Sequence, residues 1–195
     1  MVTVGETFYA PDRASWREWL EKNHSKKKEI FLIFYKKGSG KPRVEYMDAV
    51  REALCFGWID SVVKPRDEES YCQRFSPRKK GSKVSELNLV HAEKLFREGH
   101  MKKEGLEALG EDKDRVLHAH RKKEASPQLS KDVESALKED PEVWKHYQKF
   151  PKAYQRIRMA WIEGAREKPP IMKQRLAYFI KMTKKNKRYG MLEKE

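Results

Sequence analysis

Residues 53–82 combine ionic, aromatic and glycine residues in one short stretch, and such a mixture marks either a tight structural corner or a binding site. Asp60 follows Trp58 in a β-like run in which polar residues lie between apolar ones, and Arg74 lies in the next such run. A half-buried aspartate needs a cationic partner, because burying an unpaired charge is costly. Arg74 is the first candidate for this partner, and Arg78 and Lys36 are the alternatives. The pair would be either a structural ion pair or part of a ligand site.

Further ionic residues are expected at the ends of neighbouring elements. His24 ends a predicted helix, where the helix dipole favours a cation, and Lys36 ends a predicted strand. Arg78 begins a basic turn whose side chains and amides suit a phosphate or a carboxylate. The alternatives are a helix cap for His24 and an exposed charged turn for residues 73–82. The predicted ligand-binding residues are His24, Lys36, Trp58, Asp60, Arg74 and Arg78.

The sequence indicates neither nucleophilic nor metal chemistry. A general base usually comes with a second tuned group, and no such partner of Asp60 can be named. Cys55 and Cys72 lack metal or CxxC spacing and are typical of buried thiols in a reducing compartment. We therefore expect no metal and no cofactor, leave catalytic residues unassigned, and favour a non-enzymatic protein in the cytoplasm.

The chain is strongly basic, with a net charge of +14 over 195 residues, and the charge is uneven. Residues 141–195 contain 15 Lys and Arg against 5 Asp and Glu. Charge of this size attracts anions, so the candidate partners are an anionic small molecule, an acidic protein or nucleic acid. The basic C-terminal faces are interrupted by aromatic residues, as in many nucleic-acid binders, although most of these rings follow the apolar stripe of a core: Tyr154, Trp161, Tyr178 and Tyr189.

Periodicity predicts alternating helices and strands up to about residue 109. Helices are expected up to Asn23 and over residues 46–56, 85–98 and 101–109, and strands over 29–36, 58–64 and 71–75. The strand at 29–36 is apolar on both alternating faces, so it should be covered on both sides or lie inside a sheet. The expected fold class is α+β, with a small, mainly antiparallel sheet packed against helices.

A helical module follows a charged connector. Helical segments are expected over residues 130–138, 141–166 and 171–187, with a break at Phe150–Pro151. The predicted domains are an α+β domain over residues 1–112, a connector over 113–129 and a helical module over 130–195. The longest apolar run is far too short to span a bilayer.

Several motifs together resemble the YdeI/OmpD-associated, or bacteriocin-protection, family. Those in the first half are WREWLEKNH, FYKKGSGKP, DAVREALCFGWIDS, YCQRFSPRKKGS and EGHMKKEGL, between Phe8 and Leu109. Those in the second half are ALKEDPEVWKHYQKF and RIRMAWIEGAREK, and this part, 130–188, resembles the short OmpD-associated (OmdA) helical module of that family. The resemblance implies an intracellular protein linked to envelope stress, with no established enzyme activity or cofactor.

The leading functional hypothesis is thus a non-enzymatic stress-protection protein that binds an unidentified ligand, such as a small anion. The first alternative is a nucleic-acid-binding protein that uses the basic C-terminal helices. The second is an uncharacterised enzyme that acts on an anionic small molecule.

Overall fold

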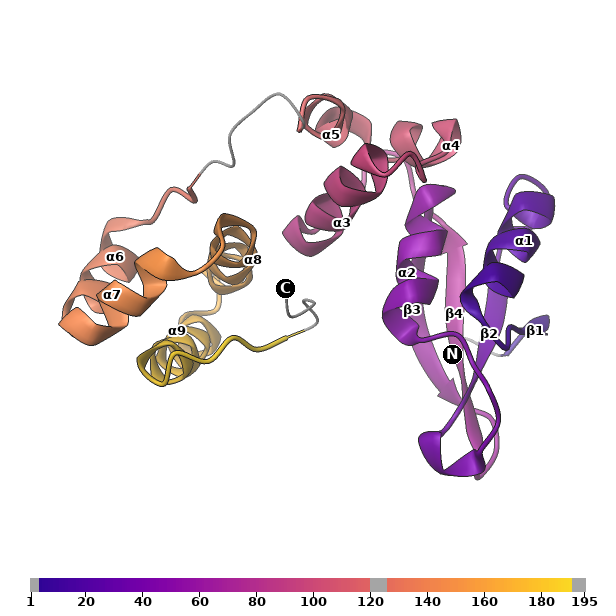
Figure 1. The fold of residues 1–195 in the computed structure, drawn as a ribbon, viewed down its shortest axis with the longest axis horizontal. Coiled ribbons are helices and arrows are strands. Elements are labelled where there is room, and N and C mark those ends of the chain that lie inside the picture. The colour runs from indigo at the N-terminus through magenta and orange to yellow at the C-terminus, as the bar shows by residue number, and fades with distance from the viewer. Residues whose placement is uncertain (1–3, 120–125, 191–195) are drawn as a thin grey trace. The chain divides into compact units, whose positions relative to one another are not determined.

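The computed structural model of the protein describes residues 4–119 and 126–190. The chain divides into two compact units, residues 1–120 and 121–195 (Figure 1). Each unit contains a hydrophobic core of its own.

The first unit is built on a four-stranded sheet with the order β1-β2-β4-β3. The strands are β1 (Thr7–Tyr9), β2 (Ile30–Tyr35), β3 (Trp58–Pro65) and β4 (Ser70–Pro77). β4 runs antiparallel to both of its neighbours, β2 and β3, whereas β1 runs parallel to β2. The α+β class is confirmed, and the sheet is mixed rather than purely antiparallel.

Two helices of this unit begin at short polar residues that cap them. Asp12 accepts a hydrogen bond from the Ser15 amide (2.8 Å), and Ser85 accepts one from the Asn88 amide (3.2 Å), as side chains at an N-cap do. The helices are α1 (Arg13–Asn23), α2 (Tyr46–Cys55), α3 (Glu86–Arg97), α4 (Lys103–Glu107) and α5 (Lys113–Leu117), with short 3-10 turns at Lys37–Ser39 and Gly110–Asp112.

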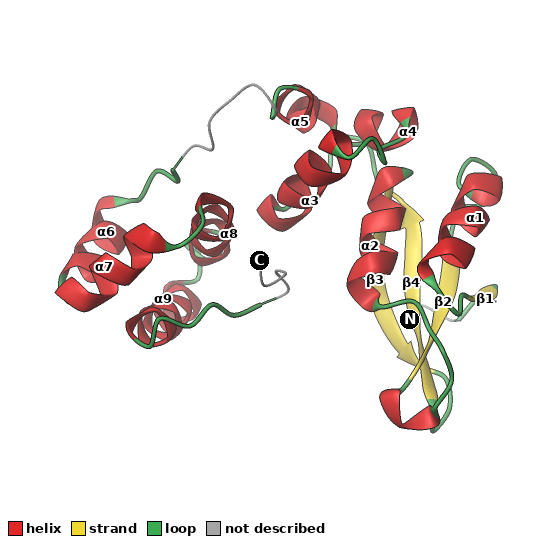
Figure 2. Ribbon diagram, in the orientation of Figure 1, coloured by secondary structure: helices red, strands yellow, loops and turns green. Residues whose placement is uncertain are grey.

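The two faces of β2 enter two different apolar clusters. Successive side chains of a strand point to opposite faces. Ile30, Leu32 and Phe34 pack into the main core under α1 and α2, whose positions beside the strands are shown in Figure 2. Phe31 and Ile33 form a small cluster on the other face with Cys72. The strand that is apolar on both faces therefore lies inside the sheet, as predicted.

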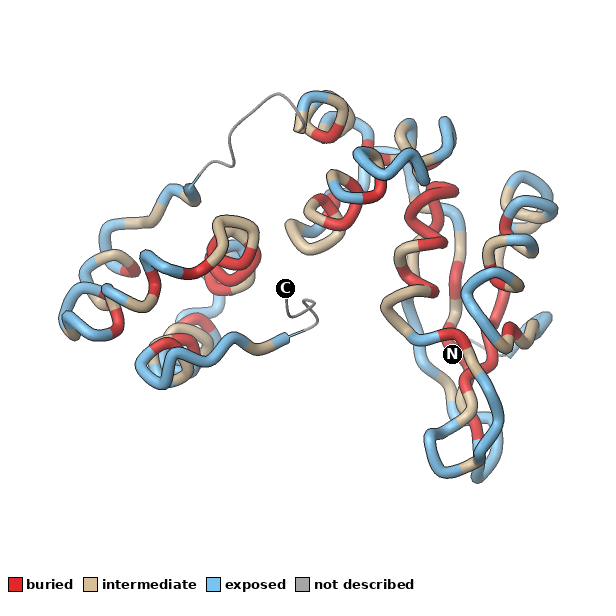
Figure 3. Tube along the Cα trace, viewed as in Figure 1, coloured by how far each residue is buried: buried red, intermediate tan, exposed pale blue. Residues whose placement is uncertain are grey.

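α4 approaches the end of α2 so closely that only glycine fits at one position. A Cβ atom on Gly105 would lie 2.2 Å from the carbonyl oxygen of Cys55, well inside van der Waals contact. The Lys102 amide donates a hydrogen bond to the same oxygen (3.0 Å). This contact holds the chain after α3 against the buried stretch of α2, which Figure 3 shows in red.

Part of the expected connector belongs to the first unit. Residues 113–117, assigned to the connector because of their charge density, form α5, which packs against α3. Val116 is fully buried, and Arg115 forms ion pairs with Glu86 (2.5 Å) and Glu93 (2.9 Å) of α3. Arg115, one of the charges that suggested a solvated linker, is in fact the partner of two carboxylates on α3.

The second unit consists of helices in residues 126–190. They are α6 (Lys131–Lys138), α7 (Pro141–Lys149), α8 (Lys152–Glu163) and α9 (Pro169–Lys184). Asp140 caps α7 and Pro141 is its first residue, a position where proline loses no hydrogen bond. The predicted break at Phe150–Pro151 separates α7 from α8, so the three expected helical segments are four helices.

Candidate functional site

Asp60 and Arg74 lie on opposite faces of the sheet. Asp60 is paired with Phe75 across β3 and β4, and Phe75 is buried in the core under the helices. On that face Asp60 accepts a hydrogen bond from the Tyr46 hydroxyl (2.7 Å). Arg74 is next to Phe75 on β4, so it points to the other face, where it pairs with Glu29 (2.7 Å). The expected pairing of Asp60 with Arg74 is therefore wrong: an intervening sheet separates their side chains.

Lys36 and Arg78 lie at opposite ends of the sheet. Lys36 follows β2 directly, beside the first residue of β4, and its amine donates to the Glu68 carbonyl oxygen (2.7 Å). Arg78 follows the last residue of β4. At about 3.3 Å per residue, the length of β4 places the two residues roughly 25 Å apart. The six predicted residues therefore do not form one recess.

His24, Trp58 and Arg78 do lie at one end of the sheet. His24 is the C-cap of α1, and its carbonyl oxygen accepts a hydrogen bond from the Trp58 indole (3.2 Å). The Arg78 amide donates to the carbonyl oxygen of Gly57, the residue before Trp58 (2.9 Å). The His24 ring packs on Phe56, with 5.2 Å between the ring centroids. Two of the six predicted residues thus make a structural contact, with Arg78 nearby.

Arg78 is incompletely paired. Its Nη2 donates to the Lys83 carbonyl oxygen, but its Nε and Nη1 are buried and have no hydrogen-bond partner in the described part of the chain. Burial also lowers the pKa of Arg78. Ligand binding by this arginine therefore stays a prediction.

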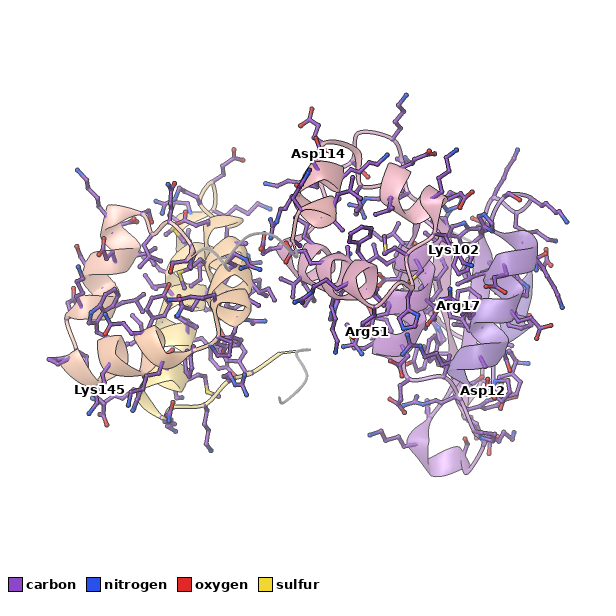
Figure 4. The ribbon with its side chains drawn as sticks, turned by 45° about the horizontal axis from the view of Figure 1, so that its top comes forward. Asp12, Arg17, Arg51, Lys102, Asp114 and Lys145 are labelled. Atoms are coloured by element: carbon purple, nitrogen blue, oxygen red, sulfur yellow. The ribbon has the colours of Figure 1, made fainter. Side chains whose placement is uncertain are left out.

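A buried ion triad in the first unit escaped the sequence analysis. The side chain of Glu52 on α2 is only 2 % exposed, and its carboxylate binds Arg13 (2.5 Å) and Arg17 (2.6 Å) of α1. Figure 4 labels Arg17, which reaches α2 from the neighbouring helix. The only sequence signal is the spacing of the two arginines, which are four residues apart and so share one helix face. Because each oxygen of Glu52 already has a cationic partner, the triad fastens α1 to α2 and leaves neither oxygen of this carboxylate unpaired.

A second group of charges in the second unit has a different character. Six residues from α8, α9 and the segment after α9 form what we call the basic–aromatic cluster: Arg158, Arg175, Tyr154, Trp161, Tyr178 and Tyr189. The Arg158 guanidinium carbon lies 4.6 Å from the ring centroid of Tyr189, 5.4 Å from Tyr154 and 5.7 Å from Trp161. The Arg175 guanidinium carbon lies 4.9 Å from the Trp161 ring centroid. Its Nη1 donates a hydrogen bond to the backbone carbonyl oxygen of Trp161.

Arg158 is buried without a carboxylate. The residue is 8 % exposed, its Nε has no hydrogen-bond partner, and no carboxylate in residues 4–119 or 126–190 forms an ion pair with it. The Tyr189 hydroxyl beside it also lacks a hydrogen-bond partner among these residues. Burial raises the pKa of Tyr189, and the nearby guanidinium opposes that shift. Contact with aromatic faces compensates only part of the cost of burying a cation.

The chain after α9 fits closely over Arg158. Gly190 has a positive φ of 97°, and a Cβ atom there would lie 2.5 Å from Nη2 of Arg158. The cluster therefore holds a guanidinium next to the Tyr189 hydroxyl, with a second guanidinium against the same indole. This donor set is suited to an oxyanion such as a phosphate or carboxylate. The aromatic residues can be recognised in the sequence, but the burial of Arg158 among them cannot.

The comparisons with known families assign the two units separately. Residues 8–108, more than half of the chain, match the family described as "Domain of unknown function (DUF8412)". The chain belongs to this family. Residues 126–186 match a second family model, OmdA, described as "Bacteriocin-protection, YdeI or OmpD-Associated". The resemblance to the YdeI/OmpD-associated family is thereby confirmed for the OmdA region, which contains all of the basic–aromatic cluster except Tyr189.

The remaining comparisons and the arrangement of the described residues do not identify a substrate or a reaction. No curated protein and no solved structure matches the chain. In the described residues, histidine, cysteine and carboxylate side chains nowhere gather in threes as a metal site would need. None of the described helices combines the length and apolar character required to cross a bilayer.

Proposed function

We propose that this protein is a non-enzymatic binding protein for an anionic ligand, and that the basic–aromatic cluster of the OmdA region receives the anion. The match to a bacteriocin-protection family supports a role in protection against stress. The free, buried thiols of Cys55 and Cys72 support a location in the cytoplasm.

The burial of Arg158 without a carboxylate partner in the described part of the chain carries this proposal. A buried charge is normally paired, because desolvation costs several kcal/mol that only a close counter-charge offsets. A bound phosphate or carboxylate would supply that counter-charge through paired N–H···O bonds to the guanidinium. Arg175, held against the same indole, would add a second cation without a structural rearrangement.

The shifted titratable groups support binding rather than catalysis. Burial, with a smaller contribution from neighbouring charges, raises the pKa of Cys55 to about 11 and that of Tyr147 to about 12. Burial also raises the pKa of Tyr46, and its hydrogen bond to Asp60 adds to the shift. These groups therefore stay protonated near neutral pH, whereas a general base works best with a pKa close to the operating pH.

The proposal is tested by titrating the full chain with inorganic phosphate and with acetate in a calorimeter. We expect saturable binding of at least one of the two anions that Arg158→Gln abolishes. Arg158→Lys should retain weak binding, because lysine keeps the charge but loses the planar fork that pairs with two oxygens. Lys145→Gln on α7 is the matched control, because it removes one exposed positive charge from the same unit (Figure 4).

Two results would contradict the proposal. One is the absence of saturable binding of either anion to the unmodified protein. The other is a folded Arg158→Gln variant, with an unchanged circular dichroism spectrum, that binds as tightly as the unmodified protein.

A further inference from the structure

The chain from α9 onward has a charge pattern that a small anion does not require. Residues 169–190 contain seven Lys or Arg and no Asp or Glu. Lys184 is paired with Asp140 (2.8 Å), whereas Lys181 and Lys185 are exposed and form no ion pair with a described residue. One guanidinium is enough to bind a single oxyanion. The other cations of residues 169–190 therefore favour a ligand that carries more than one negative charge.

An exposed aromatic ring lies among these cations. Tyr178 is 46 % exposed, and its ring packs edge-on against the Tyr189 ring with 4.8 Å between centroids. Arg175, Tyr178, Lys181 and Lys185 are spaced three, three and four residues apart, so they follow one face of α9 and its C-cap. The ring therefore lies in a row of cations, held from one side by a second ring and open to solvent on the other.

We propose that this face of α9 binds single-stranded nucleic acid. A base stacks on Tyr178, one phosphate pairs with the guanidinium groups of Arg158 and Arg175, and neighbouring phosphates lie along Lys181 and Lys185. The inference rests on the proposed function, because it assigns the bound anion to a phosphodiester. Unstacked bases offer their faces to aromatic side chains, whereas the bases of a duplex are already stacked on each other.

A lipid surface fits the same face less well. A helix that lies in a membrane interface inserts a continuous apolar stripe. The apolar residues Met172 and Phe179 of α9 are instead buried in the core of the second unit, and only Ile171 and Tyr178 are exposed large apolar residues there. The solvent side of α9 is mainly cationic, which favours a phosphodiester chain over acyl chains.

The test is fluorescence anisotropy of a labelled oligouridylate of about 12 nucleotides, a length within the usual site size of single-strand binders, titrated with the full chain. Tyr178→Ala should weaken binding about ten-fold or more, through the loss of one stacked base. Ile171→Ala is the matched control: it shortens an exposed apolar side chain two turns earlier on the same helix and should leave the affinity unchanged.

The electrostatic part of the proposal is tested with two lysines. Lys181→Ala should lower the affinity and reduce the slope of log affinity against log salt by about 0.7, the value for one lost phosphate contact on a single strand. Lys145→Ala on α7 removes the same charge from the same unit and should change neither quantity beyond a small general effect.

The outcomes separate this inference from the proposed function. If phosphate binds in an Arg158-dependent way but the oligonucleotide does not bind, or binds independently of Tyr178, the nucleic-acid inference is wrong and the proposed function stands. If neither ligand binds, both are wrong. Equal affinity for a duplex of the same length, or Tyr178-dependent capture by phosphatidylglycerol vesicles with no oligonucleotide binding, also overturns the inference.

Discussion

The two units each bury a charged side chain, and they surround it in opposite ways. In the first unit the carboxylate of Glu52 is bound by two arginines from the neighbouring helix. In the second unit Arg158 is surrounded by tyrosine and tryptophan rings and has no carboxylate among the described residues. A buried charge that is fully paired within the protein connects two helices, whereas one without a counter-charge can still bind an ion of opposite charge. Pairing, rather than burial alone, therefore separates a structural charge from a candidate site.

The largest effect is expected at Glu52. Glu52→Gln leaves Arg13 and Arg17 around a neutral amide, and loss of one member of a buried ion network costs about 3 kcal/mol of unfolding free energy. Urea denaturation followed by circular dichroism measures this loss. Glu18→Gln is the control: Glu18 is 64 % exposed in its pair with Lys22, and such pairs contribute about 0.5 kcal/mol. Equal losses in the two variants would show that the triad does not hold α1 to α2.

The second-largest effect is expected at Arg158, with the opposite sign. Replacing an unpaired buried cation by an apolar side chain of similar length removes its desolvation cost, so Arg158→Met should raise the unfolding free energy by about 1 kcal/mol or more. The same variant should lose phosphate binding in the calorimeter. A loss of stability comparable to that of Glu52→Gln would instead show that Arg158 is a structural cation, held by its aromatic contacts.

Asp60 tests whether a residue expected at the site is structural. Asp60→Asn keeps an oxygen that can accept the Tyr46 hydrogen bond but removes its charge, so we expect a loss of about 1 kcal/mol in unfolding free energy. Phosphate affinity should not change, because the site proposed here is in the other unit. A lower phosphate affinity in a folded Asp60→Asn variant would show that the anion binds at the sheet of the first unit instead.

The smallest effect is expected at an exposed ion network in the second unit. Hydrogen bonds from Arg166 and Ser130 lower the pKa of Asp132 to about 2, below its ordinary value of 3.8. The stability that this carboxylate contributes is complete above pH 3.8 and is lost as the pH falls through about 2. The melting temperatures of the unmodified protein and Asp132→Asn should therefore differ near neutral pH and converge at about pH 2. A difference of the same size at both pH values would contradict this assignment.

The elements of the fold were predictable because their signals are local. The break between α7 and α8 follows from Pro151, the start of α7 from Asp140 and Pro141, and the interior position of β2 from its two apolar faces. The anchoring of α5 was not predicted, because its charges resemble those of a loop or a poorly anchored helix. The partners of Arg115 on α3 lie more than 20 residues away in the sequence, where no local pattern reveals them.

The faces of β3 show a second limit. Strict alternation puts Trp58, Asp60 and Val62 on one face, but a bulge between Asp60 and Val63 inserts an extra residue. Val63, rather than Val62, pairs with Gln73, so the alternation changes after Asp60. A bulge depends on how two strands fit together, and the sequence of one strand does not contain that information.

The amino-acid sequence by itself determined the fold class, the family of the C-terminal region and the basic character of the chain, because composition, periodicity and motif spacing are properties of short segments. Only the tertiary structure decided which charges are neutralised. It separated Asp60 from Arg74 by the thickness of a sheet, gave Glu52 two arginines and left Arg158 among aromatic rings. The physical reason is that the energy of a charge depends on its burial and on the nearest opposite charge, and both are set by contacts between residues far apart in the chain.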